Sequence, residues 1–130
     1  MKVTDFAFVG HPVADLQRAR TFYETVLRLP PPAVLSGDLN GPRGFLEYSI
    51  GENTLAITTD WSDGQPPESP SVGLILEVED FAEAIRHIEK CGVSFVMGPF
   101  EGPSCSIALI TDPDGNTIGI HKRKSSAGGT

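Results

Sequence analysis

The sequence lacks the features that mark membrane, exported and disulfide-rich proteins. No apolar run approaches the ~20 residues that a membrane-spanning helix needs. The first residues lack the apolar core of a signal peptide. Only two cysteines are present, Cys91 and Cys105, which is too few for a disulfide scaffold and agrees with a reducing compartment. We therefore expect a cytoplasmic protein that does not enter a membrane.

Basic residues are also scarce. The chain has 10 Lys and Arg against 17 Asp and Glu, a formal net charge of −7, and its one basic cluster is Lys122-Arg123-Lys124. Because nucleic-acid binding depends on clustered Lys and Arg, we expect no nucleic-acid partner. The Gly-rich segments form neither a P-loop nor a dinucleotide fingerprint. What remains is an ordinary globular composition in 130 residues, enough for one compact body.

Two landmarks occur twice, in the same order. Val13-Ala14-Asp15-Leu16 opens one apolar-periodic stretch, and Val78-Glu79-Asp80-Phe81 opens another 65 positions later. The segment 51–58 is echoed 63 positions later by 114–121. Two landmarks at nearly the same offset indicate two copies of one supersecondary unit.

Apolar periodicity predicts one helix in each copy. The first has Asp15 as N-cap and an apolar face of Leu16, Ala19, Phe22, Tyr23, Val26 and Leu27, ending before Pro30-Pro31-Pro32. The second has the capping pair Asp80 and Glu83 and stops at Gly92. Strands are predicted at 6–9, 44–50, 54–59, 72–78, 93–96, 104–110 and 117–121, with a loop over 33–43 that includes a further strand within 33–39. A turn is predicted at 112–116.

Each half therefore has the order β-α-β-β-β, and the predicted fold class is α+β. Neither half can bury both faces of its sheet alone, so we expect two curved mixed sheets to pair around a pocket, with the helices outside. The prediction is a single domain over 1–124, made of module one (about 1–60), a linker (60–71) and module two (about 72–124). Residues 125–130 are expected to form a flexible tail.

Three segments resemble the vicinal oxygen chelate superfamily, which includes glyoxalase I, extradiol dioxygenases and bleomycin-resistance proteins. Residues 13–27 look like its first helix, with the Phe22-Tyr23 pair and the following Leu27. Residues 78–81 look like its second helix start, and 112–118 like its late turn into the last strand. The resemblance implies the paired-module fold and a homodimer, and it leaves open whether modules pair within a chain or between subunits. Such a fold hosts many chemistries.

The resemblance also implies where a divalent metal would sit. The family's enzymes hold it with His and Glu from the first and last strands of each module. The first-strand positions fall on Phe8 (or Ala7, if a bulge intervenes) and Gly73, and the last-strand positions on Ala56 and Gly119. None of the residues present at these positions has a side-chain atom that can donate to a metal. We therefore predict no metal and no other cofactor at these positions.

Other residues are candidates for binding or chemistry. His121 shares a strand face with Gly119, and is either a ligand-contacting imidazole or a rim histidine bonded to a backbone carbonyl. Strict alternation places His11 on the helix-facing side, whereas a bulge at 10–12 would turn it into the pocket. Glu77 shares a face with Gly73 and Ile75, and the face of Glu47 is open; each is either a buried base or an edge carboxylate in water.

Trp61 either covers the pocket or stacks on a planar ligand, or else it packs at a module or subunit contact. His87 is expected to be solvated on the second helix, and the two cysteines are expected to be small core residues. A displaced metal site at His11, Glu77 and His121 is the alternative to a metal-free protein.

These observations favour a protein that binds a small organic molecule in an apolar pocket without a catalytic metal. The predicted ligand-binding residues are Phe8, His11, Glu47, Ala56, Thr58, Trp61, Gly73, Ile75, Glu77, Gly119 and His121. One alternative is a metal-dependent lyase, isomerase or dioxygenase with a displaced site. Another is a protein that sequesters an antibiotic, for which the acidic charge would suit a cationic drug.

Overall fold

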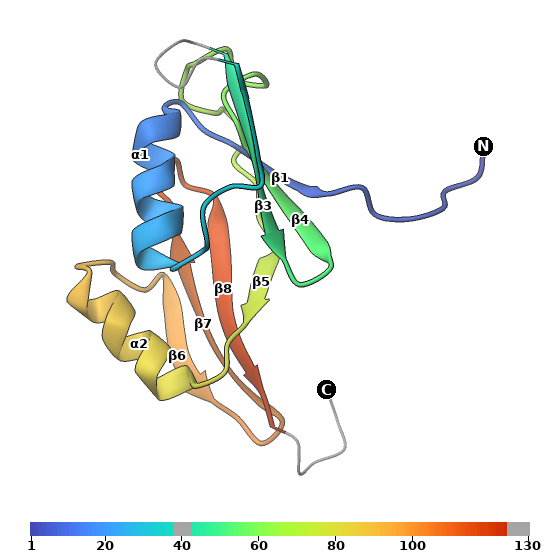
Figure 1. Cartoon of the computed structure of the whole chain (residues 1–130). Helices are drawn as coiled ribbons and strands as arrows, with labels where there is room; N and C mark the ends of the chain where they lie inside the picture. Colours follow the sequence, from blue (N-terminus) through green and yellow to red (C-terminus); the bar gives the residue numbers. More distant parts are fainter. Residues whose placement is uncertain (38–42, 125–130) are drawn as a thin grey trace. The chain divides into compact units, whose positions relative to one another are not determined.

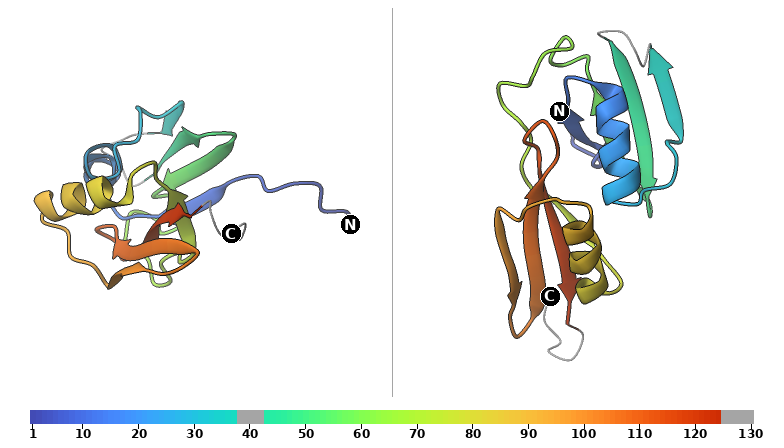
Figure 2. Two further views of the ribbon diagram at one scale, coloured as in Figure 1. Left: turned by 90° about the horizontal axis from the view of Figure 1, so that it is seen from below. Right: turned by 90° about the vertical axis from the view of Figure 1, so that its left-hand side faces the viewer.

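The chain folds into two units with the same internal order. The structure is a computed structural model that describes residues 1–37 and 43–124. It divides into Met1–Ser71 and Val72–Thr130, which are called module one and module two from here on. Each module is a four-stranded mixed sheet with a helix on one face (Figure 1 and Figure 2). The predicted α+β fold of two tandem β-α-β-β-β modules is confirmed.

Module one has the strand order β1-β4-β3-β2, with β1 parallel to β4 and the other neighbours antiparallel. Its helix α1 continues into a π-helical turn, η1, and packs against β4. The elements are β1 (Val9–Pro12), α1 (Leu16–Thr21), η1 (Phe22–Val26), β2 (Val34–Gly37), β3 (Gly44–Ile50) and β4 (Asn53–Thr58).

Module two repeats that arrangement as β5-β8-β7-β6, with β5 parallel to β8. Its helix α2 packs against β8. The elements are β5 (Leu74–Glu77), α2 (Phe81–Lys90), β6 (Met97–Glu101), β7 (Cys105–Thr111) and β8 (Thr117–Arg123).

The repeat extends to single hydrogen bonds. The side chain of Asp15 accepts a bond from the backbone N–H of Arg18, and Asp80 accepts the equivalent bond from Glu83, so both predicted N-caps are confirmed. After the first strand of each module, one backbone N–H reaches the last strand over 2.9 Å: Val13 to the carbonyl of Thr58, and Val78 to that of His121. The two modules therefore have equivalent positions that can be compared one by one.

Each core lies between a helix and one face of its sheet. In module one the helix buries most of the predicted apolar face, and the strands contribute the residues that alternate toward it. The buried residues there are Leu16, Ala19, Phe22, Tyr23, Leu46, Tyr48, Leu55 and Ile57. In module two the corresponding residues are Phe81, Ile88, Ala108, Ile110, Ile118 and Ile120.

The first strand lies further along the chain than predicted. The sequence predicts a strand at residues 6–9, but β1 is Val9–Pro12 and Phe6 is exposed. β1 is the edge of its sheet, where a proline need not donate a ladder hydrogen bond. Pairing with β4 from Val9–Leu55 to Pro12–Thr58 sets its position.

The strand predicted at residues 93–96 is also displaced. The N–H of Val93 still bonds to helix α2 through the carbonyl of Ile88, and β6 runs instead over Met97–Glu101. The Gly98-Pro99 pair lies inside this edge strand, where the register shifts between Met97 and Phe100. The strand predicted within 33–39 is β2, while the rest of the predicted loop, 38–42, and the predicted tail, 125–130, lie outside the described residues.

Candidate functional site

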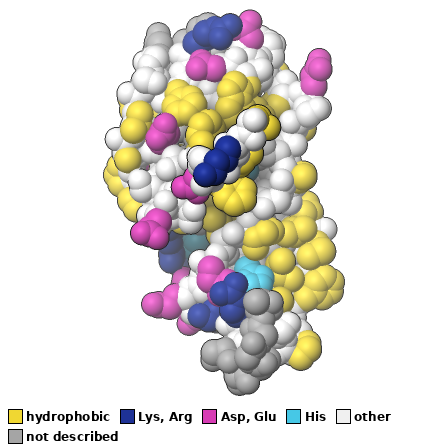
Figure 3. All heavy atoms as spheres, turned by 90° about the vertical axis from the view of Figure 1, so that its right-hand side faces the viewer, with side chains coloured by type: hydrophobic (Ala, Val, Ile, Leu, Met, Phe, Trp, Pro, Cys, Tyr) yellow, Lys and Arg dark blue, Asp and Glu magenta, His cyan; other side chains and the backbone are white. Residues whose placement is uncertain are grey.

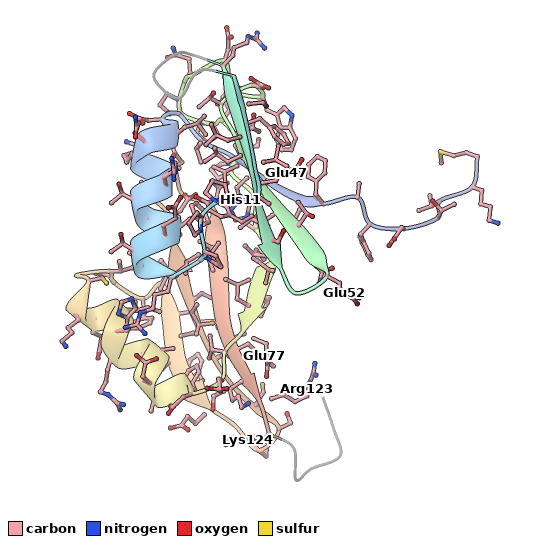
Figure 4. All side chains as sticks on the ribbon, viewed as in Figure 1. His11, Glu47, Glu52, Glu77, Arg123 and Lys124 are labelled. Carbon is pink, nitrogen blue, oxygen red and sulfur yellow. The ribbon has the colours of Figure 1, made fainter. Side chains whose placement is uncertain are left out.

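The sheet of module one presents an aromatic face on the side away from α1. Alternation places Phe45 and Glu47 of β3 and Ala56 and Thr58 of β4 on this side, since Phe45 pairs with Thr58 and Glu47 with Ala56. In Figure 4, Glu47 lies on the side of the sheet opposite α1. We define the aromatic face of module one as Phe8, Gly10, Phe45, Glu47, Ala56, Thr58 and Trp61.

Three rings meet on this face. Phe8 stacks on Trp61 with ring centroids 6.2 Å apart and planes 20° from parallel, and meets Phe45 edge-on at 6.2 Å. Phe8 is 42% exposed and Trp61 56% exposed. The indole lies directly over Gly10, where any Cβ would meet it. The absence of a side chain at Gly10 is therefore what lets Trp61 lie flat against the strand.

The remaining candidates on the aromatic face differ in accessibility. Ala56 is fully buried and lies between Gly10 on one neighbouring strand and Glu47 on the other, while Glu47 is half-buried. Thr58 is buried, and its hydroxyl donates to the carbonyl of Gly44 over 2.9 Å and accepts from the N–H of Asp60 over 2.9 Å. The Thr58 hydroxyl is therefore occupied by two backbone groups in this structure.

His11 lies on the opposite face, toward α1. It is fully buried, and its Nδ1 is 2.6 Å from the hydroxyl of Tyr23 (Figure 4). His11 therefore lies on the helix-facing side, as strict alternation predicts, and no bulge turns it to the aromatic face.

A polar network not anticipated from the sequence lies beside it. The hydroxyl of Tyr48 donates to Glu24 over 2.7 Å, and Glu24 accepts from the Arg20 guanidinium over 2.8 Å. The Arg20 hydrogen bond holds the pKa of Glu24 below its usual value, although burial opposes the shift, and burial with the bond to Glu24 raises the pKa of Tyr48. The i,i+4 spacing of Arg20 and Glu24 was a usable signal, but the link to Tyr48 needs the fold.

Module two presents a different face away from its helix. Register places Ile75, Gly119, Leu109 and Met97 in one row across the four strands. The next row is Glu77, His121, Ile107 and Phe100. We define these two rows as the apolar face of module two. Several of its side chains are open to solvent, and Figure 3 shows hydrophobic side chains gathered on the surface of the molecule.

The two glycines Gly119 and Gly73 have different surroundings. A Cβ at Gly119 would meet the Ile75 side chain and come within 3.2 Å of Leu109, so these side chains occupy the space beside this glycine. A Cβ at Gly73 would meet nothing within 4 Å, but Gly73 has φ of +105°, which favours glycine.

Glu77 and His121, both candidates from the sequence, meet at the edge of this face. His121 Nδ1 is 2.6 Å from Glu77 Oε1, and Glu77 Oε2 accepts the backbone N–H of Arg123 over 2.7 Å. The Arg123 N–H first, and then His121, hold the pKa of Glu77 below its usual value. The equivalent pair in module one is Pro12 and Thr58, so this carboxylate–imidazole pair is particular to module two.

The family's metal positions do not fit a metal in this chain. Phe8, Ala56, Gly73 and Gly119 offer no donor atom. Over residues 1–37 and 43–124, no group of three or more His, Cys, Asp and Glu side chains is arranged to hold a metal ion. The alternative site from the sequence would need His11 to join Glu77 and His121, and the His11 ring is bonded to Tyr23.

One contact in module two was not predicted from the sequence. Cys91 Sγ lies 3.7 Å from Nε2 of His87, one helical turn earlier in the chain. The i,i+4 spacing of these two residues at the end of a predicted helix was a usable signal for this contact. Cys91 is exposed, so its prediction as a core residue is wrong, whereas Cys105 lies on β7 and is partly exposed.

Comparison with known proteins places the chain in a family. Residues 6–120 match the model of the Glyoxalase/Bleomycin resistance protein/Dioxygenase superfamily, and the chain belongs to it. The lactoylglutathione lyase of Salmonella typhimurium is 30% identical over 126 residues, which cover 90% of this chain and 91% of that protein. The lactoylglutathione lyase of Haemophilus influenzae is 29% identical over 127 residues, with the same coverage of each chain.

Solved structures show the same fold. TnmS3, an antibiotic binding protein from Streptomyces sp. CB03234, superposes with a TM-score of 0.71 at 25% identity over 95% of this chain and 99% of its own. A glyoxalase/bleomycin resistance protein from the same organism gives 0.69 at 28% identity, over 89% of this chain and 98% of its own. In the part of the chain that the structure describes, no helix is long and apolar enough to cross a membrane.

Proposed function

We propose that this protein binds a small planar organic molecule on the aromatic face of module one, in an apolar pocket and without a catalytic metal. The carrying observation is the exposed stack of Phe8 and Trp61. A planar ligand that packs against these rings would bury apolar surface and gain stacking energy of about 0.5–1.5 kcal/mol per aromatic pair beyond it. Glu47, which is half-buried on the same face, would accept a hydrogen bond from such a ligand or favour a cation.

Antibiotic sequestration is the specific form of this function that the comparisons favour. TnmS3 is an antibiotic binding protein of the same fold, and sequestration requires binding without chemistry. The same module-one face would serve it, because many antibiotics present a planar ring system. The net charge of −7 would favour a cationic one.

Lyase activity like that of the lactoylglutathione lyases is the second candidate, favoured by their identity over nine-tenths of the chain. It would require a divalent metal away from the family positions, since Phe8, Ala56, Gly73 and Gly119 cannot ligate one. Metal analysis of the purified protein separates the two. One tightly held divalent ion per chain supports the lyase, and loss of that ion in His121→Ala would locate it.

The setting we propose is a cytoplasmic homodimer without nucleic-acid or membrane partners. The large apolar side chains that stay exposed in one chain support an assembly, because monomers rarely expose extended apolar patches. Sedimentation velocity of the whole chain tests the dimer.

Binding on the aromatic face is tested by isothermal titration with 2-methoxynaphthalene, a planar aromatic without an acidic group. Trp61→Ala removes the larger ring and should weaken binding roughly tenfold, since stacking and lost apolar contact together reach about 1.4 kcal/mol. The matched control is Phe6→Ala, which removes an exposed ring that belongs to neither defined face. Equal affinities of wild type and Trp61→Ala would reject the proposal.

A further inference from the structure

Glu77 and His121 form a fixed carboxylate–imidazole pair. Both carboxylate oxygens of Glu77 are engaged on β8, Oε1 with the His121 ring over 2.6 Å and Oε2 with the N–H of Arg123 over 2.7 Å. The carboxylate therefore cannot rotate without losing a bond, and it holds the imidazole in one orientation. The side chains are 18% exposed at His121 and 46% exposed at Glu77, so the pair lies at the surface.

The bond to Glu77 assigns a role to each nitrogen of His121. An ionised carboxylate only accepts hydrogen bonds, and the pKa of Glu77 is held low by the Arg123 N–H and by His121 itself. Nδ1 is therefore the nitrogen that carries the proton. In the neutral ring Nε2 then has the lone pair, and it is the atom that can accept a proton from another molecule.

The surroundings of the pair suit an apolar molecule. His121 pairs across the sheet with Ile107, which pairs in turn with Phe100, and Ile75 lies two residues before Glu77 on the same face of β5. Ile75 is 46% exposed and Phe100 57% exposed. Arg123, two residues beyond His121 on the same strand, brings a positive charge to the same edge (Figure 4).

We infer that the Glu77–His121 pair binds the acidic hydroxyl of an aromatic ligand, a phenol or an enol, and takes its proton. The O–H bond of the ligand breaks and an Nε2–H bond forms on His121, while the Nδ1 proton stays in its bond to Glu77. The products are a bound phenolate or enolate and an imidazolium between two anions. No electrons are exchanged, and no metal or cofactor takes part.

This inference goes beyond the proposed function, because the pair lies on module two whereas the aromatic face lies on module one. It differs from a purely structural role in one respect. A clamp that only ties β5 to β8 would leave Nε2 without effect on any ligand, whereas a proton acceptor must distinguish a phenol from its methyl ether.

The test uses 4-nitrophenol, which turns yellow when it loses its proton, and 4-nitroanisole, its methyl ether. At about pH 7, wild-type protein should raise the yellow fraction of added 4-nitrophenol. It should also bind 4-nitrophenol at least tenfold more tightly than 4-nitroanisole. His121→Gln should abolish both effects, and Glu77→Gln should reduce them severalfold. His87→Gln, which changes a histidine on α2, is the matched control and should behave as wild type.

Each result of this test either supports or overturns the inference. Equal binding of the two compounds, or a yellow fraction that His121→Gln leaves unchanged, would overturn the inference while leaving the aromatic-face function to stand on its naphthalene titration. Binding of neither compound would also overturn it, including the case in which another copy of the chain covers the face. A circular dichroism spectrum and melting midpoint of each variant like those of wild type show that the loss is not unfolding.

Discussion

At the residue scale, the two glycines Gly10 and Gly119 illustrate how neighbours decide what a small residue means. The sequence predicts Ala56, Gly73 and Gly119 as ligand-binding residues. In the structure, Ile75 and Leu109 lie beside Gly119, and the Trp61 indole lies over Gly10. The sequence could predict that the family's metal donors are missing, because this follows from residue identity. It could not predict which side chains occupy the space instead.

Gly10→Ala should displace the Trp61 ring from β1, because the new Cβ would meet the indole. Trp61 is the only tryptophan in the chain, so its emission spectrum reports the change directly. We expect a shifted emission maximum with a loss of unfolding free energy within about 1 kcal/mol, since an exposed ring can move. Gly102→Ala, whose Cβ would make only an ordinary 3.5 Å contact, is the control. Identical spectra for wild type and Gly10→Ala would contradict the packing described.

Gly119→Ala should destabilise the protein by about 1 kcal/mol because Ile75 must turn away from its present rotamer. Combining it with Ile75→Ala removes the obstructing atoms. The double variant should therefore lose less stability than the two single variants added together. Chemical denaturation of the four proteins measures this coupling. Additive losses would mean that Ile75 does not contact residue 119.

At the scale of elements, local signals located the helices well but misplaced two of the four edge strands, β1 and β6. Both helix starts follow from an aspartate with a bonding partner three residues later, and Gly92 with φ of +77° ends α2. β1 and β6 begin further along the chain than predicted, and each contains a proline, Pro12 in β1 and Pro99 in β6. Their sheet positions at an edge make proline tolerable, and that is a property of the pairing rather than of the local sequence.

The equivalent N-caps predict equivalent losses. Asp15→Ala and Asp80→Ala each remove one side-chain bond to a backbone N–H in the first turn of a helix. Each should lower the free energy of unfolding by about 1 kcal/mol. Asn at either position keeps a capping oxygen and should restore most of the loss. Urea denaturation compares the four variants, and a large difference between Asp→Ala and Asp→Asn is required.

The Arg20–Glu24–Tyr48 network predicts a pH dependence. Because the pKa of Glu24 is lower in the folded chain, its contribution to stability is fully present above its unfolded value near 4.5 and is lost as the pH falls through the folded value. Glu24→Gln should therefore flatten the fall of the melting midpoint below that pH. Glu89→Gln on α2 serves as a control. An unchanged acid profile for Glu24→Gln would show that the network contributes nothing to folding.

At the scale of the whole molecule, the repeat predicted the architecture, and the proposed binding sites lie where its two copies differ. The same β-α-β-β-β order and N-caps recur in both modules. The positions that diverge are the aromatic stack at Phe8 and Trp61 in module one and the Glu77–His121 pair in module two. The sequence named all four residues as candidates. The sequence could not predict that Phe8 stacks on Trp61 or that Glu77 bonds to His121, because each contact joins segments distant in the chain.

The central claim is that the aromatic face of module one binds a planar organic molecule. The most direct measurement is the indole N–H resonance of Trp61, the single such signal in the spectrum of labelled protein. Titration with 2-methoxynaphthalene should move this resonance in a saturable way. Its saturated counterpart, 2-methoxydecalin, should leave the resonance in place, because it cannot stack. An indole resonance that neither compound moves, at concentrations up to their solubility, would contradict the account.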